Sequence, residues 1–288
     1  MSWATTKDNV RLHYEEAGQG TPIVFVHEFA GDWRAWEPQM RYFSRRHRCI
    51  TYSARGYTPS DVPKDVSAYS QDNAVQDILA VMDAAKIERA HIVGLSMGGF
   101  ATLHFGLTAP ERALSLTVAG AGYAAEKSTQ EQMRAKSRAT ADQFEKMGAK
   151  ALAPTYALGA TRVQLQNKSP RGWQEFATQL GEHDSLGAAN TMRGVQASRP
   201  SIYDFETQLK NMHVPTLVIN GDEDDQCIAP GIFLKKTIPA CGLLMLPKTG
   251  HTINLEEPDW FNLFVADFIA TVEADRWTVR DPRSMTHT

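Results

Sequence analysis

The stretch from residue 91 to residue 100, HIVGLSMGGF, places a serine between two glycines, because Gly94, Ser96 and Gly98 form a G-x-S-x-G pattern. An apolar run precedes the pattern, and a segment of helical character follows it as far as Pro110. A sharp turn from strand to helix closes only if the residues two positions either side of the serine lack side chains. The serine hydroxyl then stands above the sheet, where the dipole of the following helix favours a negative charge. The pattern could also be an ordinary turn, but its context predicts Ser96 as a nucleophile.

Strands and helices alternate on both sides of this stretch. Apolar runs cover residues 22–28, 49–54, 90–95 and 113–121, and segments of helical period cover residues 33–46, 71–86 and 98–108. This alternation predicts an α/β fold in which helices cover both faces of a parallel sheet. The N-terminal run VRLHYEEAG, residues 10–18, alternates apolar and polar side chains and predicts an antiparallel strand at the edge of that sheet.

The alternation stops between residues 124 and 205. This segment is polar, rich in Lys, Arg and Gln, and helical in its spacing, with no clear strand. Strand signals return after residue 213, and a helix follows at about 256–274. We therefore predict one sheet domain, made of residues 1–123 and 206–288, with residues 124–205 as a helical insertion over its C-terminal edge.

The composition limits the compartment and the partners. A chain of 288 residues with 42% hydrophobic content can bury a core and a pocket. The net charge of -3 shows no basic excess of the kind that nucleic-acid or anionic-membrane binding leaves. Three scattered cysteines are too few for a disulfide framework or a metal site, and no signal peptide or membrane span is evident. We expect a cytoplasmic monomer or homodimer that binds a small molecule and no metal.

A serine is a weak nucleophile and needs a base to accept its proton. Among the nine histidines, His251 stands out in PKTGHTINLEEP, residues 247–258, because it follows a predicted strand and precedes a predicted helix. That position puts it on the same rim of the sheet as Ser96, where open parallel sheets gather their functional groups. The other histidines lie within strands, helices or polar surface stretches. We predict His251 as the general base.

An orienting carboxylate is expected at the end of another strand. The stretch VINGDEDDQCIAP, residues 218–230, offers Asp222, Glu223, Asp224 and Asp225 in one loop. Such an acid holds the imidazole in its useful tautomer and stabilises the imidazolium that forms. A run of charges is also typical of a solvated turn, but the order serine, acid, histidine belongs to a known arrangement. We choose Asp224, with Asp222 and Asp225 as the alternatives.

Four motifs together resemble the α/β-hydrolase family over nearly the whole chain. They are VHEFAG at 26–31, similar to its oxyanion loop, GLSMGG at 94–99, GDEDD at 221–225 and TGHTINLEEP at 249–258. The resemblance implies an eight-stranded, mostly parallel sheet with a helical cap inserted after the sixth strand, which matches the interruption at 124–205. It also implies acyl transfer without a cofactor, with the backbone N–H groups of Phe29 and Met97 as the oxyanion hole.

These observations predict a serine hydrolase, similar to carboxylesterases and lactonases, that cleaves a small-molecule ester or lactone through an acyl-enzyme. A hydrolase of carbon–carbon bonds or enol-lactones with the same fold is the nearest alternative. A non-catalytic receptor that keeps the triad for ligand binding is another, because fold does not dictate function. Between residues 124 and 200, 11 Lys and Arg face 7 Asp and Glu, which fits either a solvated helical surface or carboxylate-bearing substrates.

Glu28 departs from the family pattern, which usually has glycine after the histidine that is His27 here. In one interpretation Glu28 pairs with a cation such as Arg34 or Arg55 and stiffens the oxyanion loop from outside. In the other, its carboxylate reaches the pocket and helps to select the substrate.

Overall fold

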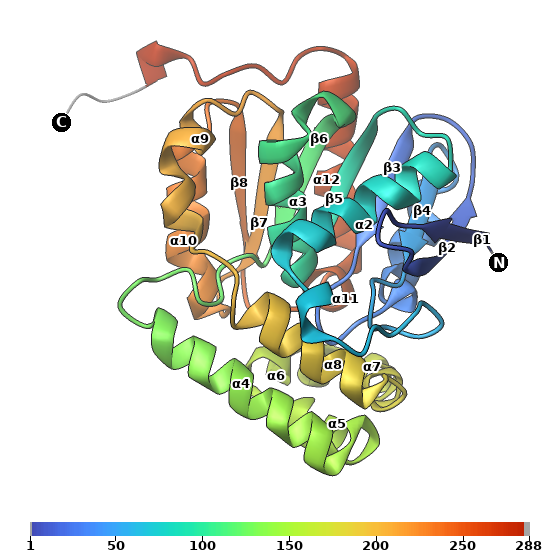
Figure 1. The fold of residues 1–288 in the computed structure, drawn as a ribbon. Helices are drawn as coiled ribbons and strands as arrows, with labels where there is room; N and C mark the ends of the chain where they lie inside the picture. Colours follow the sequence, from blue (N-terminus) through green and yellow to red (C-terminus); the bar gives the residue numbers. More distant parts are fainter. Residues whose placement is uncertain (1, 285–288) are drawn as a thin grey trace.

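The computed structural model describes residues 2–284 and contains an eight-stranded sheet (Figure 1). The strand order is β1-β2-β4-β3-β5-β6-β7-β8. The strands are β1 (Ser2–Thr5), β2 (Arg11–Ala17), β3 (Pro22–Val26), β4 (Arg48–Tyr52), β5 (Ala90–Leu95), β6 (Ala113–Ala119), β7 (Thr216–Gly221) and β8 (Cys241–Leu246). From β4 to β8 every neighbouring pair is parallel, whereas β2 is antiparallel to both β1 and β4. The predicted mostly parallel, eight-stranded sheet is confirmed.

The N-terminal edge differs in one respect from the sequence prediction. The antiparallel strand expected at 10–18 is β2, which lies second from the edge. The edge itself is β1, whose Trp3 pairs with His13 of β2. A strand of four residues shows too little alternation to be recognised from its pattern.

Helices cover both faces of the sheet (Figure 1). Helices α2 (Gln71–Ala84), α3 (Met97–Thr108) and α10 (Asp225–Thr237) pack on one face, and α1 (Glu37–Phe43) and α12 (Pro258–Glu273) pack on the other. Because both faces are covered, all six residues of the central strand β5 are buried. The two hydrophobic cores on either side of the sheet hold the strand ends in fixed positions.

Between β6 and β7 the chain forms a series of helices that lie beyond one end of the sheet, at the bottom of the view in Figure 1. They are α4 (Gln130–Met147), α5 (Ala149–Tyr156), α6 (Val163–Lys168), α7 (Pro170–Gly181) and α8 (Ser185–Thr191). The short helix α9 (Glu206–Lys210), which follows them in the chain, lies beside α10 at the upper left of the view. A third hydrophobic cluster joins Phe144 and Leu180 of this helical segment to Phe29 and Met97 of the sheet region. The division at 124 and 205 into core domain and cap stays a prediction.

The remaining helical elements are short. They are η1 (Trp33–Trp36), η2 (Val66–Ala68), η3 (Pro110–Arg112), η4 (Ala160–Arg162), the π-helical η5 (Met192–Gln196), η6 (Ile202–Phe205), α11 (Ile253–Glu256) and η7 (Pro282–Ser284). None of the helices that the structure describes is long and apolar enough to cross a membrane.

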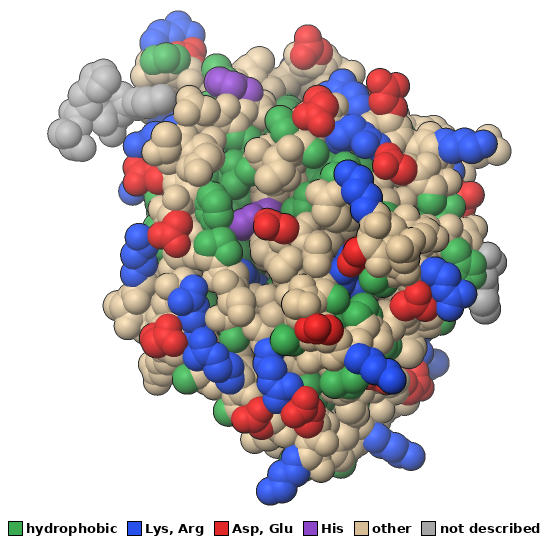
Figure 2. Space-filling view, viewed as in Figure 1, with side chains coloured by type: hydrophobic (Ala, Val, Ile, Leu, Met, Phe, Trp, Pro, Cys, Tyr) green, Lys and Arg blue, Asp and Glu red, His purple; other side chains and the backbone are tan. Residues whose placement is uncertain are grey.

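Charges of both signs are interspersed over the face shown in Figure 2. In the helical segment, Arg193 forms ion pairs with Asp142 and Glu145, and Arg138 pairs with Glu131. Arg193 is partly exposed and the other four side chains are exposed, so these ion pairs belong to a solvated surface.

Candidate active site

Ser96 lies in the sharp turn between β5 and α3. Its φ of 56° and ψ of -112° fall in a region that non-glycine residues rarely adopt. The turn is fixed from behind, because the Ser96 N–H donates a 2.8 Å hydrogen bond to the carbonyl of Ala119. The helix can approach β3 only because Gly98 has no side chain, since a Cβ there would lie 2.1 Å from the carbonyl oxygen of Val26. The backbone therefore presents the serine side chain at the C-terminal edge of the sheet.

His251 and Asp224 meet at the ends of the neighbouring strands β8 and β7. The His251 Nδ1 lies 2.6 Å from Asp224 Oδ2, and both side chains are buried. Burial alone would raise the pKa of the Asp224 carboxyl, but its interactions with His251 outweigh this effect and keep that pKa below its usual value. An ionised Asp224 accepts a hydrogen bond from Nδ1, which leaves Nε2 of His251 as the basic nitrogen.

The two alternative carboxylates lie elsewhere. Asp222 and Asp225 are exposed, and neither has a hydrogen bond to His251 among the residues described. Asp222 accepts from the Thr249 N–H at 3.3 Å instead, and Asp225 begins α10. Of the acidic residues in this loop, Asp224 has the geometry to orient the histidine.

A second buried acid, Glu256, organises the loop that carries His251. Its carboxylate accepts hydrogen bonds from the Gly250 N–H at 2.6 Å, the Thr252 N–H at 2.9 Å and the Thr252 hydroxyl at 2.8 Å. These contacts flank His251 on both sides in the chain. Glu256 therefore fixes the backbone from which the imidazole projects.

Ser96 and His251 line one cavity of about 320 Å³ between the sheet edge and the helical segment. The sheet region also contributes Glu28, Phe29 and Tyr123 to its wall, and the helical segment contributes residues that include Met133, Tyr156, Arg162, Met192 and Arg199. No hydrogen bond joins Ser96 to His251 in the described part of the chain. Such contacts are often long in unliganded enzymes and shorten when substrate binds. The cavity has the size and mixed lining of a small-molecule site.

The group that comes nearest to a metal site is Asp224, Cys227 and His251, whose candidate ligand atoms lie within 4.8 Å of one another. Burial raises the pKa of the Cys227 thiol far above its usual value, with a further contribution from Asp224. Asp224 Oδ2 and His251 Nδ1 bind each other at 2.6 Å, so these two atoms are already occupied. These three residues fit a hydrogen-bonded pair with a neighbouring thiol better than they fit a metal.

A neutral histidine braces the loop after β3. The N–H of Ala54 donates to His27 Nε2 at 3.0 Å, so Nδ1 carries the proton and donates to the Glu28 carbonyl at 2.7 Å. Burial lowers the pKa of His27 to about 4, so this tautomer is uncharged at neutral pH. The Tyr57 hydroxyl adds a 2.9 Å hydrogen bond to the carbonyl of Phe29. Two side chains thus fix the loop through its carbonyl groups.

The amide N–H groups of Phe29 and Met97 are left without an acceptor among residues 2–284. Phe29 lines the cavity, and Met97 is the first residue of α3, where amides have no partner within the helix. Two free amides beside a serine can bind the oxygen of a carbonyl as it becomes negatively charged.

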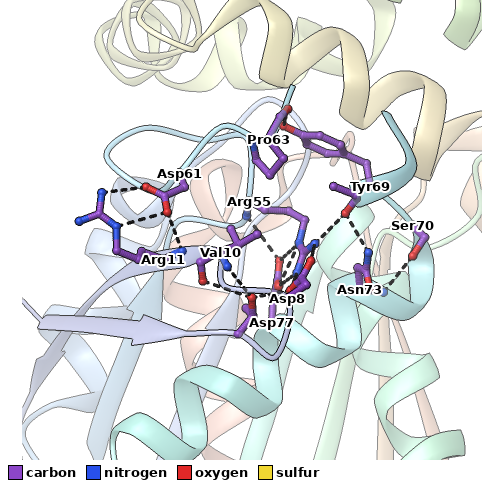
Figure 3. Close-up of polar contacts among 12 residues, drawn as sticks. Asp8, Val10, Arg11, Arg55, Asp61, Pro63, Tyr69, Ser70, Asn73 and Asp77 are labelled. Atoms are coloured by element: carbon purple, nitrogen blue, oxygen red, sulfur yellow. Dashed lines mark hydrogen bonds and ion pairs between the residues drawn. The ribbon is translucent and has the colours of Figure 1, made fainter. Parts of the chain in front are cut away.

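The prediction that Glu28 pairs with a cation such as Arg34 or Arg55 was wrong. Arg34 forms an ion pair with Asp32 at 2.7 Å, and Arg55 lies between Asp8 and Asp77, as Figure 3 shows. Arg34 is near Glu28 in the sequence and Arg55 is farther away, and both are paired with other carboxylates. Sequence distance was a poor guide to contact at this position.

Glu28 pairs instead with Arg162, which lies in η4 of the helical segment. The Glu28 Oε2 and Arg162 Nη2 atoms are 2.5 Å apart, and the two side chains are 3% and 2% exposed. Both residues line the cavity. The carboxylate therefore does reach the pocket wall, where it links the loop after β3 to the helical segment.

Two arginines of the cavity wall, Arg162 and Arg199, were not found by sequence reasoning. Both are buried, at 2% and 3% exposure, within a segment whose other cations are largely on the surface. No local motif marks them, because each is brought to the cavity by the packing of the helical segment on the sheet. Only the excess of Lys and Arg in this segment gave any signal.

The fold and this geometry are those of a class of enzymes whose functional residues lie on turns at the C-terminal edge of an α/β sheet. The family model described as alpha/beta hydrolase fold matches residues 21–258, and the chain belongs to this family. The prediction of an α/β-hydrolase is therefore confirmed.

Several known proteins are similar to the chain over most of its length. 3-Oxoadipate enol-lactonase 1 of Acinetobacter baylyi is 29% identical over 255 residues, which is 87% of this chain and 89% of the relative. The enol-lactonase of Burkholderia xenovorans LB400 superposes with a TM-score of 0.81 at 24% identity, covering 93% of this chain and 99% of that one. A bromoperoxidase of Bacillus anthracis does so with a TM-score of 0.79 at 21% identity, covering 93% and 99%.

Proposed function

We propose that the protein hydrolyses a carboxylic ester or lactone of a small molecule through an acyl-enzyme. Ser96 is the nucleophile, His251 the general base and Asp224 the residue that orients the histidine. The amides of Phe29 and Met97 bind the oxyanion. The proposal requires no metal and no cofactor.

The reaction proceeds in two halves. In the first, the Ser96 Oγ bonds to the carbonyl carbon while its proton passes to Nε2 of His251, and the carbonyl oxygen becomes an oxyanion. The bond to the leaving oxygen then breaks, and that oxygen takes the proton from His251. In the second half water attacks the acyl-enzyme, His251 accepts its proton, and the acid is released as Ser96 regains a proton.

One observation carries the proposal: the 2.6 Å contact between His251 Nδ1 and Asp224 Oδ2, on the rim where Ser96 stands in its constrained turn. The ionised carboxylate leaves Nε2 basic, and the ring lines the same cavity as the serine. A histidine with a purely structural role would need neither a buried ionised partner nor a cavity.

A fluorophosphonate probe and a chromogenic short-chain ester test the proposal. We expect the probe to label Ser96 and the ester to be turned over many times, with both results lost in Ser96→Ala. Labelling that persists in Ser96→Ala would refute the nucleophile. Stoichiometric release followed by no turnover would favour a receptor that retains the triad.

Enol-lactone hydrolysis is the second candidate. Relatives named as enol-lactonases at 29% and 27% identity favour it. The same acyl-enzyme would form, but the leaving oxygen departs as an enol, which tautomerises to a ketone. Comparing kcat/KM for an enol-lactone with that for a saturated lactone of the same ring size would distinguish the two candidates once each value is divided by the rate of alkaline hydrolysis of the same lactone. An enol is the better leaving group for any catalyst, and only an enol-lactonase should show a preference that exceeds this intrinsic difference.

A further inference from the structure

A buried arginine without an acidic partner lies in the wall of the cavity that Ser96 and His251 line. Arg199 is 3% exposed, and no carboxylate pairs with it among the residues described. Burial lowers the pKa of Arg199 to about 9, which still leaves the guanidinium charged at neutral pH. A buried charge without a counter-charge is unfavourable for folding, so this residue needs an explanation.

The position of the guanidinium is defined by two contacts. Its Nη2 donates a 2.8 Å hydrogen bond to the carbonyl of Tyr123, and its central carbon lies 3.6 Å from the centre of the Phe100 ring. Phe100 belongs to the first turn of α3, the helix that begins directly after Ser96. The Nε and Nη1 atoms have no hydrogen-bond partner in the described chain. The side chain is thus held beside the nucleophile turn with donors left over for a ligand.

The charges around the cavity also favour an anion. Its lining contains three cations, Lys136, Arg162 and Arg199, and one carboxylate, Glu28. Glu28 and Arg162 neutralise each other in their 2.5 Å ion pair. Arg199 in the wall and the exposed Lys136 are then left without a negative charge within the cavity.

We propose that Arg199 binds a carboxylate group of the substrate, so that the preferred substrate is an ester or lactone with a second, free carboxylate. This inference rests on the proposed hydrolase function. The carboxylate accepts a charge-assisted hydrogen bond from one of the unpartnered donors, Nε or Nη1, which lie on different edges of the guanidinium, and it supplies the missing counter-charge. A guanidinium suits this role because it can stack on Phe100 and donate in its own plane at the same time.

A matched pair of substrates tests the proposal by kinetics. The mono-p-nitrophenyl ester of glutaric acid carries the free carboxylate, and its methyl ester at the far end does not. We expect the wild type to prefer the first, and Arg199→Gln to lower kcat/KM for it by about 10- to 100-fold, mainly through KM, as expected for a lost hydrogen bond to a charged group. For the methyl ester, kcat/KM should change less than about threefold in Arg199→Gln. Arg199→Lys should restore part of the preference for the free carboxylate.

The control variant is Arg171→Gln, on the surface of α7 with its side chain 92% exposed. This variant should leave kcat/KM for both substrates unchanged. Equal specificity constants for the two substrates in the wild type, or equal losses in Arg199→Gln, would overturn the proposal.

A binding measurement separates this inference from the hydrolase function and does not depend on turnover. In Ser96→Ala, glutarate should raise the melting temperature and neutral glutaramide should not, and the gain should vanish when Arg199→Gln is added. An equal response to both compounds, or a gain that survives without Arg199, would contradict the proposal. If the wild type hydrolyses neither ester, the hydrolase function fails, and the glutarate response still decides whether Arg199 binds a carboxylate.

Discussion

Asp224 is distinguished from its acidic neighbours by burial and by the single contact that it makes with His251. We predict that Asp224→Asn lowers kcat on the order of 10⁴-fold, the size of effect that loss of the orienting acid has in serine proteases. An asparagine of the same shape either donates to Nδ1 or leaves it poorly held, and both disfavour the basic Nε2. Steady-state kinetics with a chromogenic ester measure the effect. The neighbouring Asp225→Asn, at an exposed position, is the control, and an equal loss there would refute the assignment.

Glu28 and Arg162 form a buried ion pair, so removing either charge leaves the other buried without a partner. We predict that Glu28→Gln or Arg162→Met alone lowers the free energy of unfolding by about 3–5 kcal/mol, and that the double variant recovers much of the loss. Urea unfolding of the four proteins gives the coupling energy. Glu16→Gln, which breaks an exposed pair with Arg48, should cost less than about 1 kcal/mol. Additive losses in the double variant would show that the two charges do not depend on each other.

The element that carries His251 is short, and its conformation depends on Glu256 at the end of α11. We predict that Glu256→Gln lowers kcat by about 10-fold or more with little change in KM, because charge-assisted bonds to both sides of His251 are lost. A purely destabilising effect would lower the melting temperature and leave kcat of the folded enzyme intact. The matched control is Asp259→Asn, in the exposed first turn of α12.

Elements that follow a strand directly could be predicted from the sequence. Ser96, Asp224 and His251 each stand just beyond an apolar run, and the ends of parallel strands meet at one edge, so their common location follows from the alternation alone. Residues in the helical segment could not be placed in this way. Arg162 and Arg199 reach the cavity because that segment packs on the sheet, and no spacing in the chain encodes this packing. The partner of Glu28 was wrong for the same reason.

At the scale of the whole molecule, four buried histidines make stability depend on pH. Burial lowers the pKa of His27, His91 and His104 to about 4 each, against 6.5 for an unperturbed histidine, and it also lowers the pKa of His13. Between pH 6.5 and pH 4 the unfolded chain therefore binds more protons than the folded one. The contribution of these histidines to the free energy of unfolding is fully present above pH 6.5 and is lost as the pH falls towards 4. Each of the three histidines with a pKa of about 4 contributes up to about 1.4 kcal/mol per pH unit within this window.

Thermal unfolding between pH 7.5 and pH 4.5 measures this dependence. We expect the melting temperature to decrease as the pH falls below 6.5, and we expect His104→Gln to make this decrease less steep, because the protonation of one of the four histidines is removed. Carboxylates with lowered pKa values, such as Asp224, act at lower pH and do not obscure the window. A melting temperature that is constant from pH 7 to pH 5 would contradict the prediction.

The Glu28–Arg162 ion pair has a further consequence for how this sequence can diverge. The two residues are 134 positions apart, yet neither charge can be lost alone without leaving the other buried. A substitution at one of these positions should therefore be accompanied by a substitution at the other. Homologous chains with glycine at the position of Glu28 are expected to lack an arginine at the position of Arg162, and an alignment of such chains should show the two positions covarying.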